Sequence, residues 1–506
     1  MSELVVAIDA GTTGVRSMVF DTAGAMIKQA YEEFPSHFPH PSWVEQNAAD
    51  WWTSACKTLR DCLADESVKP EWIISASVTN QRETIVPLDS GGNPLRNAIV
   101  WQDRRTVDQC DWIRKRVSSD DLYSITGLTV DPYFSAPKIL WIKDNEKSLF
   151  KETDVFLLVH DFILHKLTDR KVTDYSNASR TLLFDIEQQN WSDRILDCLD
   201  IPKEKLPEPI QSGTQIGELS GRAAKETGLA SGTPVVAGGG DQQCAALGVG
   251  VVREGSIKST TGTGTFMLAH SDSKRLDSKM RVLCSCHVVP GTYVVEASMF
   301  TTGSALRWFR DNLGLQERLH AEAEGRDPYE VMTDAADGVP AGSEGVIHIP
   351  HLVGAGAPHW NPRARGIFAG LALGHTRGHL MRSVLEGVAY EIRTNLNVMR
   401  ELGLSASEMR VTGGAARSET WMQIQADVLN VPVVRTQLEE ATALGAAILA
   451  CHGVGVFKSI AEAAEEMVTP LAPLNPRPEN RSVYDEGFER YSALYKATAG
   501  FTWGDN

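Results

Sequence analysis

Apolar residues near the start of the chain are gathered in short runs separated by turn residues. Runs at residues 4–9, 15–21 and 25–34 are divided by a glycine-threonine turn at 11–14 and by a second turn at 21–24. Short runs bounded by Gly, Asp and Thr are typical of strands joined as antiparallel hairpins. The pattern therefore predicts three consecutive antiparallel strands at the beginning of the protein.

The period of the pattern then changes. Residues 50–64 place apolar side chains at the spacing of one helix face, and residues 73–79 form a run of small and apolar residues. The first pattern predicts an amphipathic helix and the second a buried strand. Hairpins followed by a helix and a further strand indicate an α/β protein.

A similar succession returns in the middle of the chain. The predicted elements there are a strand at 233–237 that leads into a triple glycine and Asp241, strands at 256–261, 265–269, 281–289 and 292–297, and helices at 304–313, 378–402, 418–429 and 442–451. A strand-turn-strand opening that occurs twice predicts a duplicated domain, with a cleft between the two copies and a boundary within residues 245–255. The alternative is a single irregular α/β protein whose hairpins merely look alike.

Charge and composition narrow the classes of function. Of 506 residues, 49 are Lys or Arg and 65 are Asp or Glu, which gives a net charge of −16. This balance argues against a broad nucleic-acid surface, which needs clustered positive charge. It leaves ATP binding open, because backbone amides and magnesium hold phosphates locally.

The eight cysteines form no CxxC pair, so we expect neither a disulfide framework nor a structural zinc site. Residues 284–287, with two Cys and one His, leave a metal site as an alternative, but we interpret residues 282–288 as a strand. We find no signal peptide and no apolar run of membrane-spanning length. We therefore expect a cytoplasmic protein without membrane insertion.

Three glycine-rich turns follow predicted strands and suit a nucleotide site. The turns begin near Gly11, Gly262 and Gly413. Glycine lets backbone amides approach phosphates, threonine adds small hydroxyl donors, and a carboxylate at a strand end suits magnesium. Asp9 lies at the end of an apolar strand, where an unpaired carboxylate is costly unless it meets an ion or a donor. Each turn alone is typical of ordinary structure; together they favour nucleotide binding.

Two longer stretches make the chain resemble a known family. Residues 133–145 resemble the N-terminal signature of the FGGY carbohydrate kinases, and residues 366–371 with 379–386 resemble their C-terminal signature. The resemblance covers nearly the whole chain. It implies the superfold of sugar kinases, actin and heat-shock chaperone ATPases, with two RNase H-like α/β domains at 1–247 and 248–506 that flank a catalytic cleft. It also implies ATP-dependent phosphorylation of a small-molecule polyol, with ATP and Mg²⁺ as cofactors.

Residues 79–84, 97–106, 131–134 and 172–181 are similar to the glycerol kinase branch of that family. The resemblance implies Asp241 as the catalytic base, and Asp9 with Asp241 as the holders of Mg²⁺. The implied polyol-binding residues are Arg82, Glu83, Trp101, Tyr133, Asp241, Gln242 and Phe266. The implied nucleotide-binding residues are Thr12, Thr13, Arg16, Gly262, Thr263, Gly413, Gly414 and Ser418.

The chain also departs from the glycerol kinase pattern. Ala10 and Thr412 stand where glycerol kinases typically carry Gln and Asp, and residues 410–418 with Trp421 look more like xylulokinase-type members. Residues 217–232 do not resemble the loop that binds a regulatory sugar bisphosphate in some glycerol kinases. We therefore do not carry that allosteric site over.

Glycerol is the leading substrate, and erythritol, xylitol or a ketopentose remain alternatives. Two other classes stay open as well: a chaperone- or actin-like ATPase, and a polyol sensor without turnover. The oligomeric state, a homo-oligomer included, and any regulator are left open by the sequence.

Overall fold

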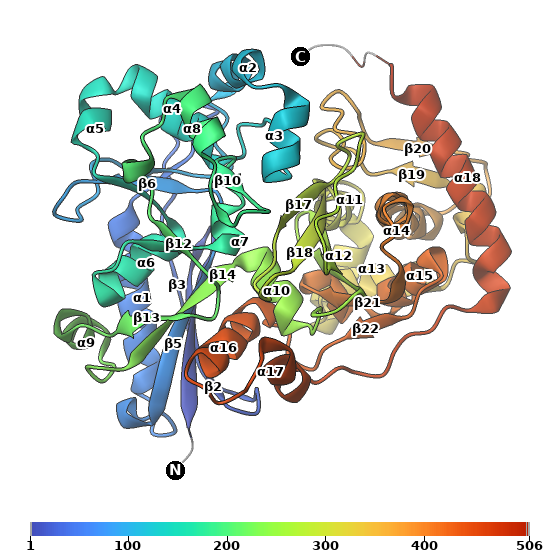
Figure 1. The fold of residues 1–506 in the computed structure, drawn as a ribbon. Coiled ribbons are helices and arrows are strands. Elements are labelled where there is room, and N and C mark those ends of the chain that lie inside the picture. Colours follow the sequence, from blue (N-terminus) through green and yellow to red (C-terminus); the bar gives the residue numbers. More distant parts are fainter. Residues whose placement is uncertain (1–2, 502, 504–506) are drawn as a thin grey trace.

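The protein is built from two α/β halves that lie side by side (Figure 1). The computed structural model describes residues 3–501 and 503. In Figure 1 the elements up to β14 form the half on the left, and most later elements form the half on the right. Within the described residues, each half contains one six-stranded sheet.

The first sheet has the strand order β13-β14-β5-β1-β2-β3. Its strands are β1 (Leu4–Ala10), β2 (Gly14–Asp21), β3 (Met26–Glu33), β5 (Ile73–Asn80), β13 (Gln215–Glu218) and β14 (Pro234–Gly240). Strands β1, β5 and β14 are parallel, and β1, β2 and β3 form antiparallel hairpins. Both faces of β1 are buried, which explains why its sequence is a continuous apolar run rather than an alternating one.

The second sheet repeats this arrangement, in the order β17-β18-β16-β15-β21-β22. Its strands are β15 (Gly255–Thr261), β16 (Thr265–Ser271), β17 (Leu283–Cys286), β18 (Tyr293–Met299), β21 (Ala406–Thr412) and β22 (Val433–Arg435). Strand β15 pairs parallel with β21 and antiparallel with β16, as β1 pairs with β5 and β2. The duplicated α/β fold predicted from the hairpin pattern is confirmed.

Two helices lie between the sheets, α10 (Asp241–Gly248) and α16 (Ala441–Gly453). Cys244 and Leu247 of α10 join α16 and α17 (Ile460–Met467) in a core that covers one face of the first sheet. On its other side, α10 packs Ala245 and Ala246 against the second sheet. The end of the chain therefore returns to complete the core of the first half.

The remaining elements cover the outer faces. Helices α1 (Ala48–Leu63), α6 (Val159–Thr168) and α9 (Gly221–Thr227) cover the first sheet from outside. Above it lie β4 (Glu45–Gln46), β6 (Ile85–Leu88), β7 (Ala98–Ile99), β8 (Val155–Leu158), α2 (Val107–Arg116), α3 (Ser119–Thr126), α4 (Ser135–Asn145), α5 (Lys147–Glu152) and α8 (Asp193–Leu199). The short elements nearby are α7 (Tyr175–Ala178), β9 (Val172–Asp174), β10 (Phe184–Asp185), β11 (Asn190–Trp191) and β12 (Glu208–Ile210).

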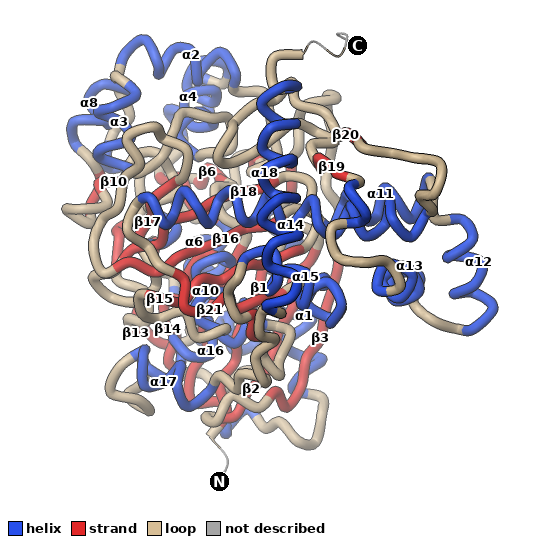
Figure 2. The backbone as a smooth tube through the Cα atoms, turned by 90° about the vertical axis from the view of Figure 1, so that its right-hand side faces the viewer, coloured by secondary structure: helices blue, strands red, loops and turns tan. Residues whose placement is uncertain are grey.

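The outer layer of the second half consists of α11 (Gly303–Asn312), α12 (Leu315–Glu324), α13 (Pro328–Asp337), α14 (Arg377–Glu401), α15 (Glu419–Leu429) and α18 (Arg481–Thr498), with the small sheet of β19 (Ile347–Ile349) and β20 (Ile367–Ala369). Figure 2 shows α11, α12 and α13 projecting to one side of the two sheets.

Most of the predicted strands and helices are confirmed within one to three residues. Strand β17 is shorter than the predicted 281–289, because only four of those residues pair with β18. Strand β14 runs through the triple glycine, which the prediction placed after the strand. No helix was predicted between residues 80 and 303, so α2 to α10 were missed, and α12, α13, α17 and α18 were not predicted either. The boundary at 247/248 falls at the end of α10 and stays a prediction, since α16 packs on the first half.

Within residues 3–501, no helix is long and apolar enough to cross a membrane.

The crossing of α10 and α16 depends on two glycines, which gives a first prediction. A Cβ added at Gly445 would lie 1.9 Å from the carbonyl oxygen of Cys244, and one at Gly248 would lie 1.8 Å from that of Ala441. We expect Gly445→Ala to force the helices apart and to cost about 2 kcal/mol of stability or more. Urea denaturation would measure it. The control is Gly221→Ala, where an added Cβ meets nothing within 4 Å. Equal midpoints for the two variants would contradict the close crossing.

Candidate active site

Polar side chains gather where the parallel strands of the first sheet end. Asp9 of β1 and Gly239 of β14 both lie opposite Thr79 of the central strand β5. The chain beyond β5 continues into Arg82 and Glu83. Since ligands of α/β proteins bind at the carboxyl ends of parallel strands, this edge of the sheet is the natural place for a site.

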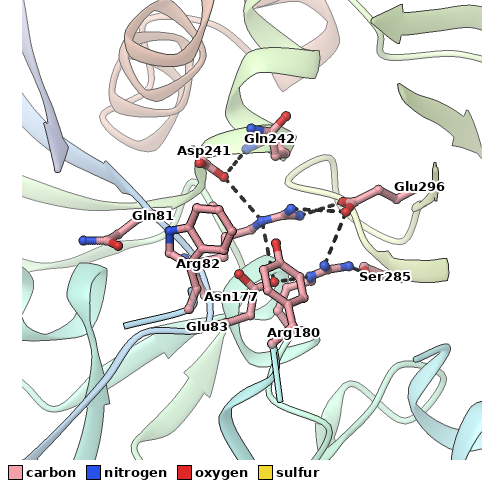
Figure 3. A network of polar contacts seen from close by, with 12 residues as sticks. Gln81, Arg82, Glu83, Asn177, Arg180, Asp241, Gln242, Ser285 and Glu296 are labelled. Carbon is pink, nitrogen blue, oxygen red and sulfur yellow. Dashed lines mark hydrogen bonds and ion pairs between the residues drawn. The ribbon is translucent and has the colours of Figure 1, made fainter. Parts of the chain in front are cut away.

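Arg82 is the centre of this group (Figure 3). Its Nη1 donates to Glu296 Oε2 at 2.8 Å and to Gln243 Oε1 at 3.1 Å, and its Nη2 donates to Glu296 Oε1 at 3.2 Å. Its Nε lies 3.3 Å from Asp241 Oδ1. The side chain passes over Gly240, where a Cβ would lie 2.6 Å from Arg82 Cδ. The last glycine of the triple glycine therefore leaves the space that the guanidinium group needs.

Glu296 comes from β18 of the second sheet and also meets Arg180, whose Nη2 lies 3.3 Å from Glu296 Oε1. Arg180 Nε in turn donates to Glu83 Oε1 at 2.7 Å. Burial alone raises the pKa of Glu296, but the guanidinium groups of Arg180 and Arg82 outweigh it and hold the pKa at about 2. Burial raises the pKa of Glu83, against the attraction of the same two arginines. The four side chains form a buried ion-pair network that joins the two halves.

Asp241 begins α10 beside this network. Its Oδ1 accepts a hydrogen bond from the backbone N–H of Gln242 at 2.7 Å. Burial raises the pKa of Asp241, whereas Arg82 and Lys258 lower it. Because 31% of the side chain is exposed, water moderates the rise. Asp241 is thus a partly accessible carboxylate set against a buried guanidinium group.

Lys258 of β15 fixes the residue after Asp241. Its Nζ donates to Gln242 Oε1 at 2.5 Å. Lys258 is fully buried, and burial lowers its pKa to about 7, although Asp241 and Glu296 favour the charged form. With its side-chain oxygen engaged by Lys258, the Gln242 amide has its N–H groups left to offer a ligand.

Asp9 lies close enough to Asp241 for the two charges to interact. Burial, the charge of Asp241 and that of Glu440 raise the pKa of Asp9 to about 7, with Arg16 acting against them. Among residues 3–501, no three His, Cys, Asp or Glu side chains are grouped as a protein-only metal site. Two carboxylates that oppose each other's ionisation still fit Mg²⁺, which takes one or two carboxylates and completes its shell with water and phosphate.

Aromatic side chains border the charged group. The rings of Tyr133 and Trp101 meet edge to face, 5.7 Å apart between centroids. Burial raises the pKa of Tyr133, so its hydroxyl keeps its proton. Phe266 lies on β16, two residues before the position opposite both Lys258 and Glu296. Side chains two apart on a strand point to the same face, so Phe266 shares the face that meets the first half.

A cavity of about 460 Å³ lies between the second sheet and its helices. Its lining includes Gly262, Thr263, Gly414 and Ser418, together with the aromatic side chains Tyr329 and Trp421. Of the predicted nucleotide-binding residues, these four are brought together. Gly413 lies behind them with φ of +87°, against the Thr261 carbonyl.

The predicted residues of the first hairpin do not line this cavity. Thr12 Oγ1 accepts a hydrogen bond from Trp101 Nε1 at 3.0 Å, and Thr13 Oγ1 lies 3.2 Å from the hydroxyl of Tyr31. Arg16 forms an ion pair with Glu440, which precedes α16. The hairpin is therefore tied to the aromatic wall on one side and to the second half on the other.

Three charged residues of the site were not among the predicted site residues: Arg180 and Glu296 of the network, and Lys258 beside it. Lys258 and Glu296 each lie within a buried strand, where a lone charge is costly unless it is paired. A charged residue inside a predicted buried strand was therefore the sequence signal that could have identified both. Arg180 lies in segment 172–181, which was singled out for its resemblance but given no role.

Comparisons with known proteins agree along most of the chain. The model for the N-terminal domain of the FGGY family of carbohydrate kinases matches residues 4–248, and the model for the C-terminal domain matches residues 257–454. A glycerol kinase of Bacillus mycoides (strain KBAB4) is 37% identical over 470 residues, which cover 91% of this chain and 92% of that protein. A glycerol kinase of Bacillus anthracis (strain A0248) is 37% identical over 477 residues, covering 92% and 93%.

Solved structures are similar over the full length. A xylulose kinase from Rhodospirillum rubrum has a TM-score of 0.91 at 29% identity and covers 99% of this chain and 100% of its own. A Plasmodium falciparum glycerol kinase, solved with ADP, has a TM-score of 0.88 at 25% identity, with coverage of 100% and 99%.

The raised pKa of Asp9 gives a second prediction. A carboxyl whose pKa rises from 3.8 to about 7 on folding takes up a proton in that window, so its contribution to the unfolding free energy falls as pH increases from about 4 to 7. Since Asp9 is only partly buried, we expect a loss of about 1–2 kcal/mol rather than the full shift.

Asp9→Asn removes this group, so the ligand-free variant should lose less stability than the wild type between these pH values. Urea unfolding at both ends of the window would measure the difference, in which the titrating groups that do not interact with Asp9 cancel. Superimposable pH profiles would contradict the assignment.

Proposed function

Because the chain belongs to the FGGY family of carbohydrate kinases, we propose that it transfers the γ-phosphoryl group of ATP to a hydroxyl of glycerol, forming glycerol 3-phosphate. The observation that carries this proposal is the partly exposed carboxylate of Asp241 beside buried Arg82 and Glu83, with Tyr133 and Trp101 close by. A small polyol presents hydroxyl groups on one side and C–H groups on the other. Such a ligand needs acceptors, donors and an aromatic surface within a few ångströms of each other.

The hydrogen-bonding capacity that remains in the network limits what each residue offers. Both terminal nitrogens of Arg82 are occupied by Glu296 and Gln243, which leaves the Nε edge that faces Asp241. Asp241 offers a carboxylate acceptor and Gln242 offers its N–H groups. We propose that the reacting hydroxyl lies against Asp241 and that Glu83 and Tyr133 contact the neighbouring hydroxyls. Trp101 and Phe266 would contact the carbon chain.

Asp241 would accept the proton of the attacking hydroxyl during phosphoryl transfer. A carboxylate is a weak base for an alcohol, but in a loose transition state the proton leaves late, so position matters more than basicity. Arg82 and Lys258 support this role, because their charges favour the ionised form of Asp241 against the rise in pKa that burial causes. Asp9 and Asp241 would hold Mg²⁺, which when bound offsets the charge of the phosphates.

The nucleotide is proposed to occupy the cavity lined by Gly262, Thr263, Gly414 and Ser418. Tyr329 in the same lining, which is partly exposed, provides a flat surface for a base. We keep the proposed phosphate-side role for Thr12 and Thr13 of the first turn, Arg16 at the start of β2, and Gly413 at the end of β21. ATP as donor and the eight free cysteines favour action in the cytoplasm.

A ketopentose is the second candidate substrate. The likeness to a xylulose kinase over the full length and the departures at Ala10 and Thr412 both favour it. Release of ADP measured over a panel of glycerol, erythritol, xylitol and ketopentoses distinguishes the two candidates. Turnover of ATP that no polyol or sugar accelerates would contradict the proposed function as a whole.

The catalytic proposal predicts a large effect of Asp241→Asn. The variant keeps the size of the side chain and removes the acceptor charge, so kcat should fall about a hundredfold or more. Steady-state kinetics with saturating ATP would measure it, and thermal unfolding would check that the variant folds. Near wild-type turnover in a folded variant would rule out Asp241 as the base.

The substrate proposal predicts strong selection for three adjacent hydroxyls. A site that buries charged groups for a hydroxyl rejects an analogue that lacks it, so kcat/KM for glycerol should exceed that for 1,2- and 1,3-propanediol by about a thousandfold or more. Glu83→Ala should erase most of this preference. Trp101→Ala should improve erythritol relative to glycerol, since it removes part of the aromatic wall. A wild-type preference for a four- or five-carbon substrate would refute glycerol while leaving the kinase assignment intact.

A further inference from the structure

Lys138 is a fully buried lysine outside the ion-pair network. It lies in the first turn of α4, within the segment that resembles the N-terminal family signature. Its Nζ donates to three consecutive backbone carbonyls, those of Pro132 at 3.1 Å, Tyr133 at 2.5 Å and Phe134 at 2.9 Å. Side chains on a helix point back toward its N-terminus, so a lysine at this position reaches the loop before the helix.

Burying this ammonium group in its charged form costs free energy. Burial lowers the pKa of Lys138 to about 7, although the carboxylates of Glu83, Asp103 and Asp131 favour the charged form; Arg104 disfavours it. The N-terminus of a helix also repels positive charge. A buried Met would fill a similar volume without either penalty. What the ammonium group supplies, and an apolar side chain cannot, is a set of hydrogen bonds to three converging carbonyls.

The loop that Lys138 binds carries Tyr133. The backbone N–H of Tyr133 donates to Asp131 Oδ1 at 2.9 Å, and the ring meets Trp101 edge to face. Arg180 of the ion-pair network lies 5.6 Å from the centre of the Tyr133 ring. With the carbonyls on both sides of Tyr133 held by one ammonium group, the backbone of this residue cannot rotate without breaking a charged hydrogen bond.

We propose that Lys138 is a positioning residue, which gathers the carbonyls of residues 132–134 around its ammonium group and thereby fixes Tyr133 against the polyol. The inference rests on the proposed function, since it takes Tyr133 as a contact of the polyol. It adds a role for a lysine that touches neither substrate. We expect the role to be specific to the polyol side of the reaction, because neither Lys138 nor residues 132–134 line the nucleotide cavity.

Lys138→Met tests the proposal by removing the charge at nearly constant volume. We expect KM for the best wild-type substrate to rise about tenfold or more while KM for ATP changes less than about twofold. The panel that identifies this substrate uses wild-type protein only. If the proposed function is wrong, no polyol or sugar in the wild-type panel is phosphorylated. If only this inference is wrong, Lys138→Met changes the KM values for the polyol and for ATP by the same factor.

A double-mutant cycle with Tyr133→Phe separates positioning from general destabilisation. If Lys138 acts through Tyr133, the two substitutions are strongly non-additive in the affinity for the polyol. Additive effects, or equal increases in both KM values, would overturn the proposal.

Wild-type protein provides a second test, should Lys138→Met fail to fold. As pH rises from about 6 to about 9, Lys138 loses its proton and the carbonyls lose their charged donor, so KM for the polyol should rise with pH. Tyr133→Phe should flatten this rise and leave the pH dependence of KM for ATP as in the wild type. A rise that Tyr133→Phe leaves unchanged would overturn the proposal.

Discussion

The carboxylate of Glu296 is the constraint on which the site depends. It comes from the second sheet, yet it binds two guanidinium groups of the first half, those of Arg82 and Arg180. A buried charge is tolerated only when it is paired and fully hydrogen-bonded. Neither arginine can take its position unless the two sheets approach, and Glu296 cannot be buried unless both arginines are present. The ion pairs therefore couple the assembly of the pocket to the closure of the halves.

The ion-pair network balances its own charge, since Arg82 and Arg180 face Glu83 and Glu296. Beside it, the carboxylate of Asp241 lies near Lys258, whose pKa burial lowers to about 7. Of the three carboxylates, Asp241 alone has a substantially exposed side chain, at 31% against 1% for Glu83 and 0% for Glu296. A balanced network beside one accessible carboxylate can take up a neutral ligand without a net burial of charge. This electrostatic arrangement suits a polyol better than it suits a charged substrate.

Much of this fold could be predicted from the sequence, because burial on both faces leaves an apolar run at β1 and a run of small and apolar residues at β5, and glycine turns mark the ends of β1 and β15. The two signature segments then identified the family, and the family-model matches confirm it. The pairing of Arg82 with Glu296 could not be predicted in this way. The two residues are 214 positions apart, and no local pattern records which buried charge meets which. The same holds for Lys138, whose partners are backbone carbonyls and have no residue type to detect. Gly413 shows that a glycine in a predicted nucleotide-binding turn can be explained by the backbone alone. Its positive φ and the nearby Thr261 carbonyl require a glycine, whether or not a nucleotide binds there.

The return of α16 and α17 to the first sheet has a consequence for how the chain is made. Val5, Ala7, Met18 and Phe20 face these two helices, which end at Gly453 and Met467. During synthesis from the N-terminus, that apolar face remains exposed until nearly the whole chain has left the ribosome. The first half can pair its strands early but cannot finish its core, so the two halves mature together. Exchange of whole halves between relatives would likewise have to carry α16 and α17 with the sheet that they cover.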